Sequence, residues 1–108
     1  MKRGDVWWVN FEPSVDSEIR KLRPAVIVSN NSANRFLNRV QVVPLTSTTG
    51  KCYPSEAVVL FNGSENKAMA DQIATVDKQR ITKKAGEISS KDMKQIEHAI
   101  KIQLGLPL

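Results

Sequence analysis

Arg23, Thr46 and Ser47 stand at the ends of two apolar runs and could together bind a phosphate. Arg23 directly precedes the run 24–29, and the two hydroxyl residues directly follow the run 40–45. Each run is long enough for a buried strand. If the strands are antiparallel neighbours, the start of one lies beside the end of the other. A guanidinium fork beside a hydroxyl suits a phosphate, so the pattern favours phosphate chemistry on nucleic acid.

The same residues also have plain structural interpretations. Arg23 precedes Pro24, which favours an extended backbone, and an isolated arginine at a strand entry is most often a surface residue. Thr46 and Ser47 could simply end a strand. Asp71 interrupts an expected strand over 68–76, although aspartate is depleted in strands. A buried aspartate needs a partner, so Asp71 either accepts hydrogen bonds from the backbone or belongs to a site.

Several other kinds of catalytic site are absent from the sequence. His98 is the only histidine and lies away from the apolar stripe of the last helix, as a solvated surface residue does, so there is no histidine pair for acid–base cleavage of RNA. The sequence has no dense carboxylate cluster and no glycine-rich phosphate loop. Cys52 is the only cysteine, which excludes an internal disulfide or a cysteine-based zinc site. We therefore expect no metal and no cofactor.

Composition indicates a single globular domain over residues 1–108. The net charge is +5, from 16 Lys and Arg against 11 Asp and Glu, which by itself is weak evidence for a polyanionic partner such as RNA, DNA or an acidic protein segment. No apolar run reaches the roughly 20 residues of a membrane helix. The first strand starts within a few residues of Met1, leaving no room for a signal peptide, so a cytoplasmic protein is expected.

Residues 5–11 alternate as a strand does, and both faces are apolar, which favours a small closed barrel over an open sheet. Trp7 and Trp8 should point to opposite faces, so they are more typical of a core and an interface than of base-stacking platforms. The polar segments 12–22 and 47–56 are expected to be loops, and a loop as long as the first is usually functional or mobile. Glu18 in that loop could fold over a ligand.

The remaining pattern completes a fold that is mostly β with two helices. Further strands are predicted at 24–29, 39–46, 57–61 and 68–76, with an extended segment from Ile81 and a helical turn over 77–80. Pro44 indicates a strand edge or a bulge. A short helix follows Asn30, and Asn62-Gly63 is a turn signal. Ser89 or Ser90 caps a C-terminal amphipathic helix that ends at Gly105, with a stripe of Met93, Ile96, Ala99, Ile100 and Leu104.

Short motifs spread over nearly the whole chain, in a fixed order and spacing, resemble the MazF/PemK (Kid) family of toxin endoribonucleases from type II toxin–antitoxin systems. The matching pieces are Arg3-Gly4-Asp5-Val6-Trp7, Ser17-Glu18, Arg23-Pro24-Ala25-Val26-Ile27-Val28, Val43-Pro44-Leu45-Thr46, Tyr53-Pro54, Ala70-Asp71-Gln72, Thr75-Val76-Asp77 and Arg80-Ile81. The resemblance implies a small SH3-like barrel of the CcdB/MazF/Kid type that forms a homodimer and binds single-stranded RNA in grooves at the dimer interface.

The resemblance also implies a chemistry. Family members cut RNA at short sequence motifs without a metal: the 2′-hydroxyl attacks the adjacent phosphate and leaves a 2′,3′-cyclic phosphate and a 5′-hydroxyl. The family's catalytic pair falls on Arg23 and Thr46. A cognate antitoxin, usually with an acidic C-terminal segment, occupies the RNA groove, and the basic net charge agrees with this.

From this resemblance we assign roles to individual residues. Arg23 is expected to stabilise the phosphorane and Thr46 to hold the scissile phosphate. Glu18 is the candidate for the general base or a base contact. The predicted RNA-binding set is Asn10, Glu18, Arg20, Ser47, Asp71 and Gln72.

The chain departs from the family at two places. The segment 18–22 has no glycine where members often have one, and Ala74 stands where many members carry an arginine, which leaves Arg23 as the principal cation. Two other functions stay open: a non-catalytic gyrase inhibitor of the CcdB kind, and an inactive RNA- or protein-binding barrel. The Arg23-Pro24 and Thr46 pair argues against the first, because a pure protein binder needs neither.

Overall fold

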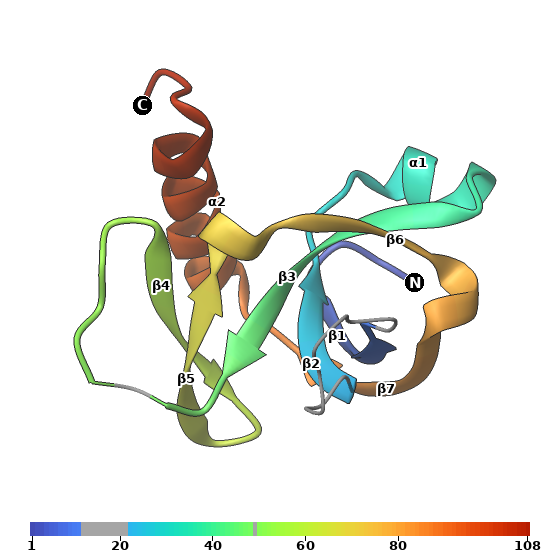
Figure 1. The fold of residues 1–108 in the computed structure, drawn as a ribbon, viewed down its shortest axis with the longest axis horizontal. Helices are drawn as coiled ribbons and strands as arrows, with labels where there is room; N and C mark the ends of the chain where they lie inside the picture. The colour runs from blue at the N-terminus through green and yellow to red at the C-terminus, as the bar shows by residue number, and fades with distance from the viewer. Residues whose placement is uncertain (12–21, 49) are drawn as a thin grey trace.

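A computed structural model describes residues 1–11, 22–48 and 50–108, as seven strands, two helices and two short 3₁₀ turns (Figure 1). The elements in order are β1 (Asp5–Asn10), β2 (Leu22–Ile27), α1 (Asn31–Phe36), β3 (Arg39–Thr46), β4 (Glu56–Phe61), β5 (Ser64–Met69), η1 (Ala70–Gln72), β6 (Ala74–Asp77), η2 (Lys78–Arg80), β7 (Ile81–Glu87) and α2 (Ser90–Leu104). These bounds confirm most of the predicted elements. No helix among the described residues is long and apolar enough to cross a membrane.

The strands form one antiparallel sheet in the order β4-β5-β3-β2-β1-β7, and β6 pairs with β3 outside this path. β3 is an interior strand of the sheet, but Pro44 lies at a local edge within it, which is one of the two alternatives predicted for this proline. On the side away from β2, β3 pairs with β6 over 39–42 and with β5 at Leu45 and Thr46. Pro44 lies in the gap between these two ladders, where β3 has no partner on that side. The sheet bends there into a half barrel, which confirms the predicted fold class (Figure 1).

Two apolar clusters fill the two faces of this bent sheet. The first lies under α2, and the second lies inside the curl of the other strands. Val6 belongs to the first cluster and Val9 to the second, because successive side chains of β1 point to opposite faces of the sheet. Both faces of β1 are therefore buried, as predicted from its apolar pattern. Trp7 packs against the second cluster, whereas Trp8 lies on the opposite face.

Helix α2 begins and ends with ordinary capping groups. The Ser89 hydroxyl accepts a hydrogen bond from the Asp92 N–H at 3.1 Å, and Gly105 closes the helix in the left-handed region at φ 70°. Met93, Ile96 and Ala99 of the predicted stripe are buried. Leu104 is not, because the last turn of α2 projects beyond the sheet (Figure 1) and leaves this side chain 53% exposed.

The predicted strand over 68–76 is wrong, because the chain turns in its middle. β5 pairs with the end of β3 and β6 with its beginning, so the chain must cross between the two, and it does so through η1. Asp71 lies in this turn and is exposed. It is therefore not the buried strand aspartate that the alternating pattern suggested.

Candidate active site

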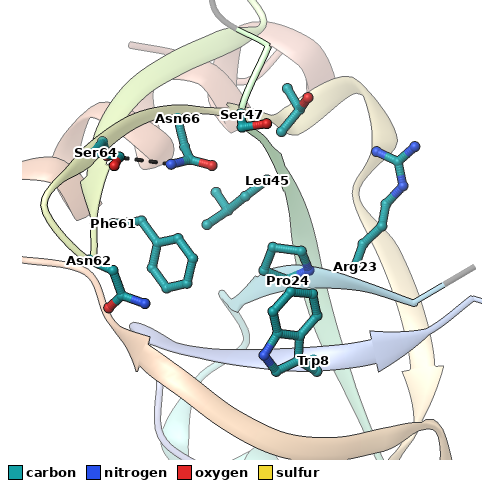
Figure 2. A pocket seen from close by; sticks show the side chains of 10 residues that line it. Trp8, Arg23, Pro24, Leu45, Ser47, Phe61, Asn62, Ser64 and Asn66 are labelled. Atoms are coloured by element: carbon teal, nitrogen blue, oxygen red, sulfur yellow. Dashed lines mark hydrogen bonds between the residues drawn. The ribbon is translucent and has the colours of Figure 1, made fainter. Parts of the chain in front are cut away.

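The register between β2 and β3 brings Arg23 and Thr46 together. Ala25 pairs with Pro44, and continuing that register by two residues puts Arg23 opposite Thr46. Both residues line a surface cavity of about 460 Å³, together with Ser47 (Figure 2). The predicted arrangement of antiparallel neighbours is confirmed, and it brings these three side chains to one rim of the sheet.

The Arg23 side chain stands at the edge of this cavity. Arg23 is exposed, and its backbone is fixed by pairing with Val9 in β1. Among the described residues its guanidinium forms no hydrogen bond and no ion pair, and Figure 2 shows the side chain extended along the cavity rim. Its charge and its five donors are thus available to an anionic ligand.

Thr46 is held in a local turn. Its Oγ1 accepts a hydrogen bond from the Thr48 N–H at 3.2 Å. A hydroxyl can accept and donate at once, so the Thr46 hydrogen is left to donate to a ligand oxygen. Ser47 follows at the same rim and is exposed.

Lys67, which no local sequence pattern indicated as a functional residue, supports the loop that follows Thr46. Lys67 is the partner of Thr46 in the ladder between β3 and β5, and its side chain is 11% exposed. Its Nζ donates to the Lys51 carbonyl oxygen at 2.9 Å and lies 3.3 Å from a Glu56 carboxylate oxygen. The same Glu56 oxygen accepts from the Tyr53 N–H at 3.0 Å. This buried pair therefore ties the loop to β4 and β5 at two points.

The Glu56 contacts predict how stability depends on pH. The Tyr53 N–H and the Lys67 ammonium outweigh burial and hold the pKa of the Glu56 carboxyl below its ordinary value of 4.5. A carboxyl group whose pKa is lowered in the folded state stabilises the fold at pH values above its ordinary pKa. This stabilisation is lost as the pH falls through the lowered pKa. We expect Glu56→Gln to lower the free energy of unfolding by about 1 kcal/mol at pH 7. The difference should shrink below pH 4.5.

Urea unfolding at pH 7 and at pH 3 measures this difference. Glu65→Gln, at an exposed position of the neighbouring strand, is the matched control and should leave the profile unchanged. A constant difference between Glu56→Gln and the unsubstituted protein at both pH values would contradict the assignment.

The inner part of the cavity combines apolar and polar side chains that the sequence did not identify as a site. Its lining beyond the rim consists of Trp8, Pro24, Leu45, Phe61, Asn62, Ser64 and Asn66 (Figure 2). Gly86 of β7 packs behind this wall. A Cβ at that position would lie 2.9 Å from the Asn62 side-chain oxygen and 3.1 Å from the Phe61 ring. The missing side chain of Gly86 therefore lets these two residues close the back of the cavity.

Three other predicted site residues, Asn10, Asp71 and Gln72, do not line this cavity. Asn10 lies at the end of β1 opposite Leu22, and its carbonyl accepts from Arg80 Nη1 at 3.4 Å. Asp71 and Gln72 lie in η1, at the opposite end of β5 from the Asn62-Gly63 turn beside the cavity (Figure 1). A single chain does not bring them to Arg23. Glu18 and Arg20 lie outside the described residues.

The residue types that bind metals are scattered in the described part of the chain. Over residues 1–11, 22–48 and 50–108, no group of three His, Cys, Asp or Glu side chains could hold a metal ion. His98 is exposed on α2, as predicted. The exposed Cys52 thiol is free.

Comparison with known sequences identifies a family over nearly the whole chain. Residues 2–104 match the model of PemK-like, MazF-like toxins of type II toxin–antitoxin systems. The endoribonuclease MazF9 of Mycobacterium tuberculosis is 34% identical, with 98% of each chain covered. Endoribonuclease EndoA of Bacillus subtilis is 32% identical, covering 98% of this chain and 96% of the relative.

Solved structures agree with these sequence matches. An endoribonuclease from a mycobacterial species, solved in complex with its cognate antitoxin, superposes with a TM-score of 0.81 at 31% identity and covers 100% of this chain and 98% of its own. MazF of Deinococcus radiodurans superposes with a TM-score of 0.82 at 25% identity, with 98% and 97% of the two chains covered.

Proposed function

The chain belongs to the family of PemK-like, MazF-like toxins of type II toxin–antitoxin systems, and on that premise we propose that it cleaves RNA at the cavity lined by Arg23, Thr46 and Ser47. Its curated relatives are endoribonucleases, so RNA is the substrate and the chain is an enzyme. One observation supports this location most strongly. A guanidinium that has no ion pair among the described residues and a threonine hydroxyl, from two different strands, line one surface cavity.

The chemistry we propose is an internal transesterification. The 2′-oxygen of a ribose forms a bond to the adjacent phosphorus, and the bond from that phosphorus to the 5′-oxygen of the next nucleotide breaks. The 2′-hydroxyl loses its proton and the departing 5′-oxygen gains one. The products are a 2′,3′-cyclic phosphate and a free 5′-hydroxyl.

Arg23 and Thr46 fit two parts of this reaction. Negative charge builds up on the non-bridging oxygens of the phosphorane, and a fixed guanidinium stabilises that charge more than it stabilises the substrate. The Thr46 hydroxyl, oriented by the Thr48 N–H, would donate to one of the same oxygens. Glu18 stays our candidate for the general base.

Incubating the purified protein with a defined RNA in EDTA tests the proposal. The expected products carry cyclic-phosphate and 5′-hydroxyl ends. Intact RNA together with stalled gyrase would favour a CcdB-like inhibitor instead, and RNA binding without cleavage would favour an inactive barrel.

Thr46→Val tests the role of the hydroxyl with little change in shape. A hydrogen bond to a charged group is worth about 1.5–3 kcal/mol, so kcat should fall roughly 10- to 100-fold. Single-turnover cleavage of the same RNA measures this fall. Thr75→Val, at an exposed position of β6, is the matched control and should cleave normally. Full activity in Thr46→Val would contradict the assignment.

We also propose that the chain is inhibited by an antitoxin with an acidic segment and acts as a homodimer. A mycobacterial relative is solved with its cognate antitoxin. The net charge of +5 and the exposed Arg23 favour an acidic ligand in the same cavity. For the dimer, a cavity of about 360 Å³ lies beside the end of α2. Its lining combines the apolar Val28, Ile73, Ile100 and Leu106 with polar and charged side chains, including Arg3, Glu97 and Lys101. A second copy of the chain would cover this mixed surface.

A further inference from the structure

Asn66 is a buried polar side chain in a position where the fold would accept an apolar one. It lies opposite Val59 in the ladder between β4 and β5, on the face that packs into the core under α2, and it is 6% exposed. Ala68, two residues further along β5, and Leu45, the partner of Ala68 in β3, both belong to that core. A polar residue at a core position that nothing in the packing requires is a common mark of a functional site.

The amide of Asn66 is only partly used. Its Nδ2 donates to the Ser64 carbonyl oxygen at 3.4 Å, a long hydrogen bond. Within the described part of the chain, its Oδ1 accepts no hydrogen bond. Figure 2 shows this side chain directed into the cavity between the strands. Burying an unpaired acceptor is costly, and a ligand that donates to Oδ1 would recover that cost.

Two aromatic side chains line the same cavity as Asn66, and Figure 2 shows Trp8 beside Pro24, across the cavity from Asn66. Trp8 and Phe61 are both half-buried, and each presents part of its ring to the cavity. Aromatic faces of this kind are platforms on which single-stranded bases stack. The other polar groups at this end come from Asn62 and Ser64. The inner part of the cavity thus combines flat apolar walls with a small number of amide and hydroxyl groups.

Asn66 lies close to Thr46 in the sheet. Asn66 precedes Lys67, the residue that pairs with Thr46, and adjacent strands lie about 4.8 Å apart. The cavity volume of about 460 Å³ falls within the range of small-molecule binding sites. One strand of RNA can therefore place a phosphate at the rim of the cavity and a base in its inner part.

We propose that the inner part of this cavity is a nucleobase subsite, in which Asn66 hydrogen-bonds the polar edge of one base of the RNA while Trp8 and Phe61 contact its faces. The inference rests on the proposed function and specifies a residue that selects the cleavage motif. A base edge that presents a donor beside an acceptor pairs with both halves of an amide. The free Oδ1 would accept from the base, and the second hydrogen of Nδ2 would donate to it.

End-mapping of cut transcripts with Asn66→Ala tests the subsite. The substitution should lower kcat/KM on the best motif of the unsubstituted protein by roughly 10- to 100-fold. It should also relax the preference at one position of that motif and leave the other positions unchanged. Asn38→Ala, at an exposed asparagine after α1, is the matched control and should keep both the rate and the motif.

Base analogues then show whether Asn66 contacts the base directly. At the relaxed position, an oligonucleotide whose base lacks the exocyclic amino group or the ring N–H should be cut roughly 10- to 100-fold more slowly by the unsubstituted protein. Asn66→Ala should cut it as fast as the parent oligonucleotide. If Asn66→Ala loses its circular dichroism spectrum or melts early, Asn66→Leu, which keeps the approximate shape and removes both polar groups of the amide, takes its place in the same comparison.

Two results would overturn the subsite while leaving the proposed function intact. One is an unchanged motif with kcat/KM within threefold of the unsubstituted protein. The other is an equal loss on all motifs and all analogues, which would make Asn66 a structural residue. If the unsubstituted protein cuts no RNA at all, the proposed function fails and the subsite fails with it.

Discussion

Arg23→Ala is expected to lower kcat for RNA cleavage by about 100- to 1000-fold, the largest effect on activity that we predict. Removing one preorganised donor from a site where charge develops typically has this effect, because water cannot replace a fixed guanidinium. Arg23 is exposed and forms no ion pair among the described residues, so its loss should leave the melting temperature nearly unchanged. Single-turnover cleavage of a defined RNA, with thermal unfolding of the same sample, measures both quantities.

Two further variants separate charge from geometry at this position. Arg39→Ala also removes one arginine charge, but at the start of β3, at the opposite end of that strand from Thr46. The Arg39 side chain is exposed as well, and this variant should cleave normally. Arg23→Lys keeps the charge without the planar fork, so its rate should lie between those of the unsubstituted protein and Arg23→Ala. Cleavage by Arg23→Ala within threefold of normal would show that another group stabilises the transition state.

Ile96→Ala should produce the largest loss of stability. Ile96 is 0% exposed and lies in the core between α2 and the sheet. Truncating a buried isoleucine removes apolar contacts and leaves a cavity, which costs about 2–5 kcal/mol. For a domain of this size that loss corresponds to a fall in melting temperature of roughly 10 °C or more. Urea unfolding followed by tryptophan fluorescence measures the change.

A control on the surface shows whether burial is the cause. Leu60→Ala shortens a side chain that is 59% exposed on β4 and should change the free energy of unfolding by no more than about 0.5 kcal/mol. Equal losses in the two variants would mean that α2 is not packed on the sheet as described. The cleavage rate per folded molecule should stay normal in both, because neither side chain lines the cavity with Arg23.

The sequence was informative where the pattern is local. The apolar runs of β2 and β3 located both strands, and the polar residues at their ends identified Arg23 and Thr46 before any register was known. The caps of α2 are equally local, and Ser89 and Gly105 lie at the predicted ends of that helix. In each case the residues that determine the local structure lie within a few positions of the residue that they place.

The sequence did not predict the features of the fold that depend on pairing between distant segments. Asp71 was a local sign against a continuous strand over 68–76, but nothing local showed that the chain leaves β5 and crosses to the other half of β3. Asn66 and Lys67 were missed for the same reason. Each is one polar residue in a strand, and only the register with β3 and β4 shows that both are buried, one in the cavity and one beneath its loop.

The pairing of β1 with β7 has a consequence for synthesis of the protein. β1 is the first strand to be translated, yet Asp5 pairs with Glu87 near the other end of the chain. Trp8 in β1 and the wall backed by Gly86 thus reach their final places only after β7 has left the ribosome, and α2 follows later still. Every residue that lines the cavity precedes Lys67, yet the sheet that holds these residues is complete only when β7 pairs with β1, so folding of the site depends on the C-terminal part of the chain.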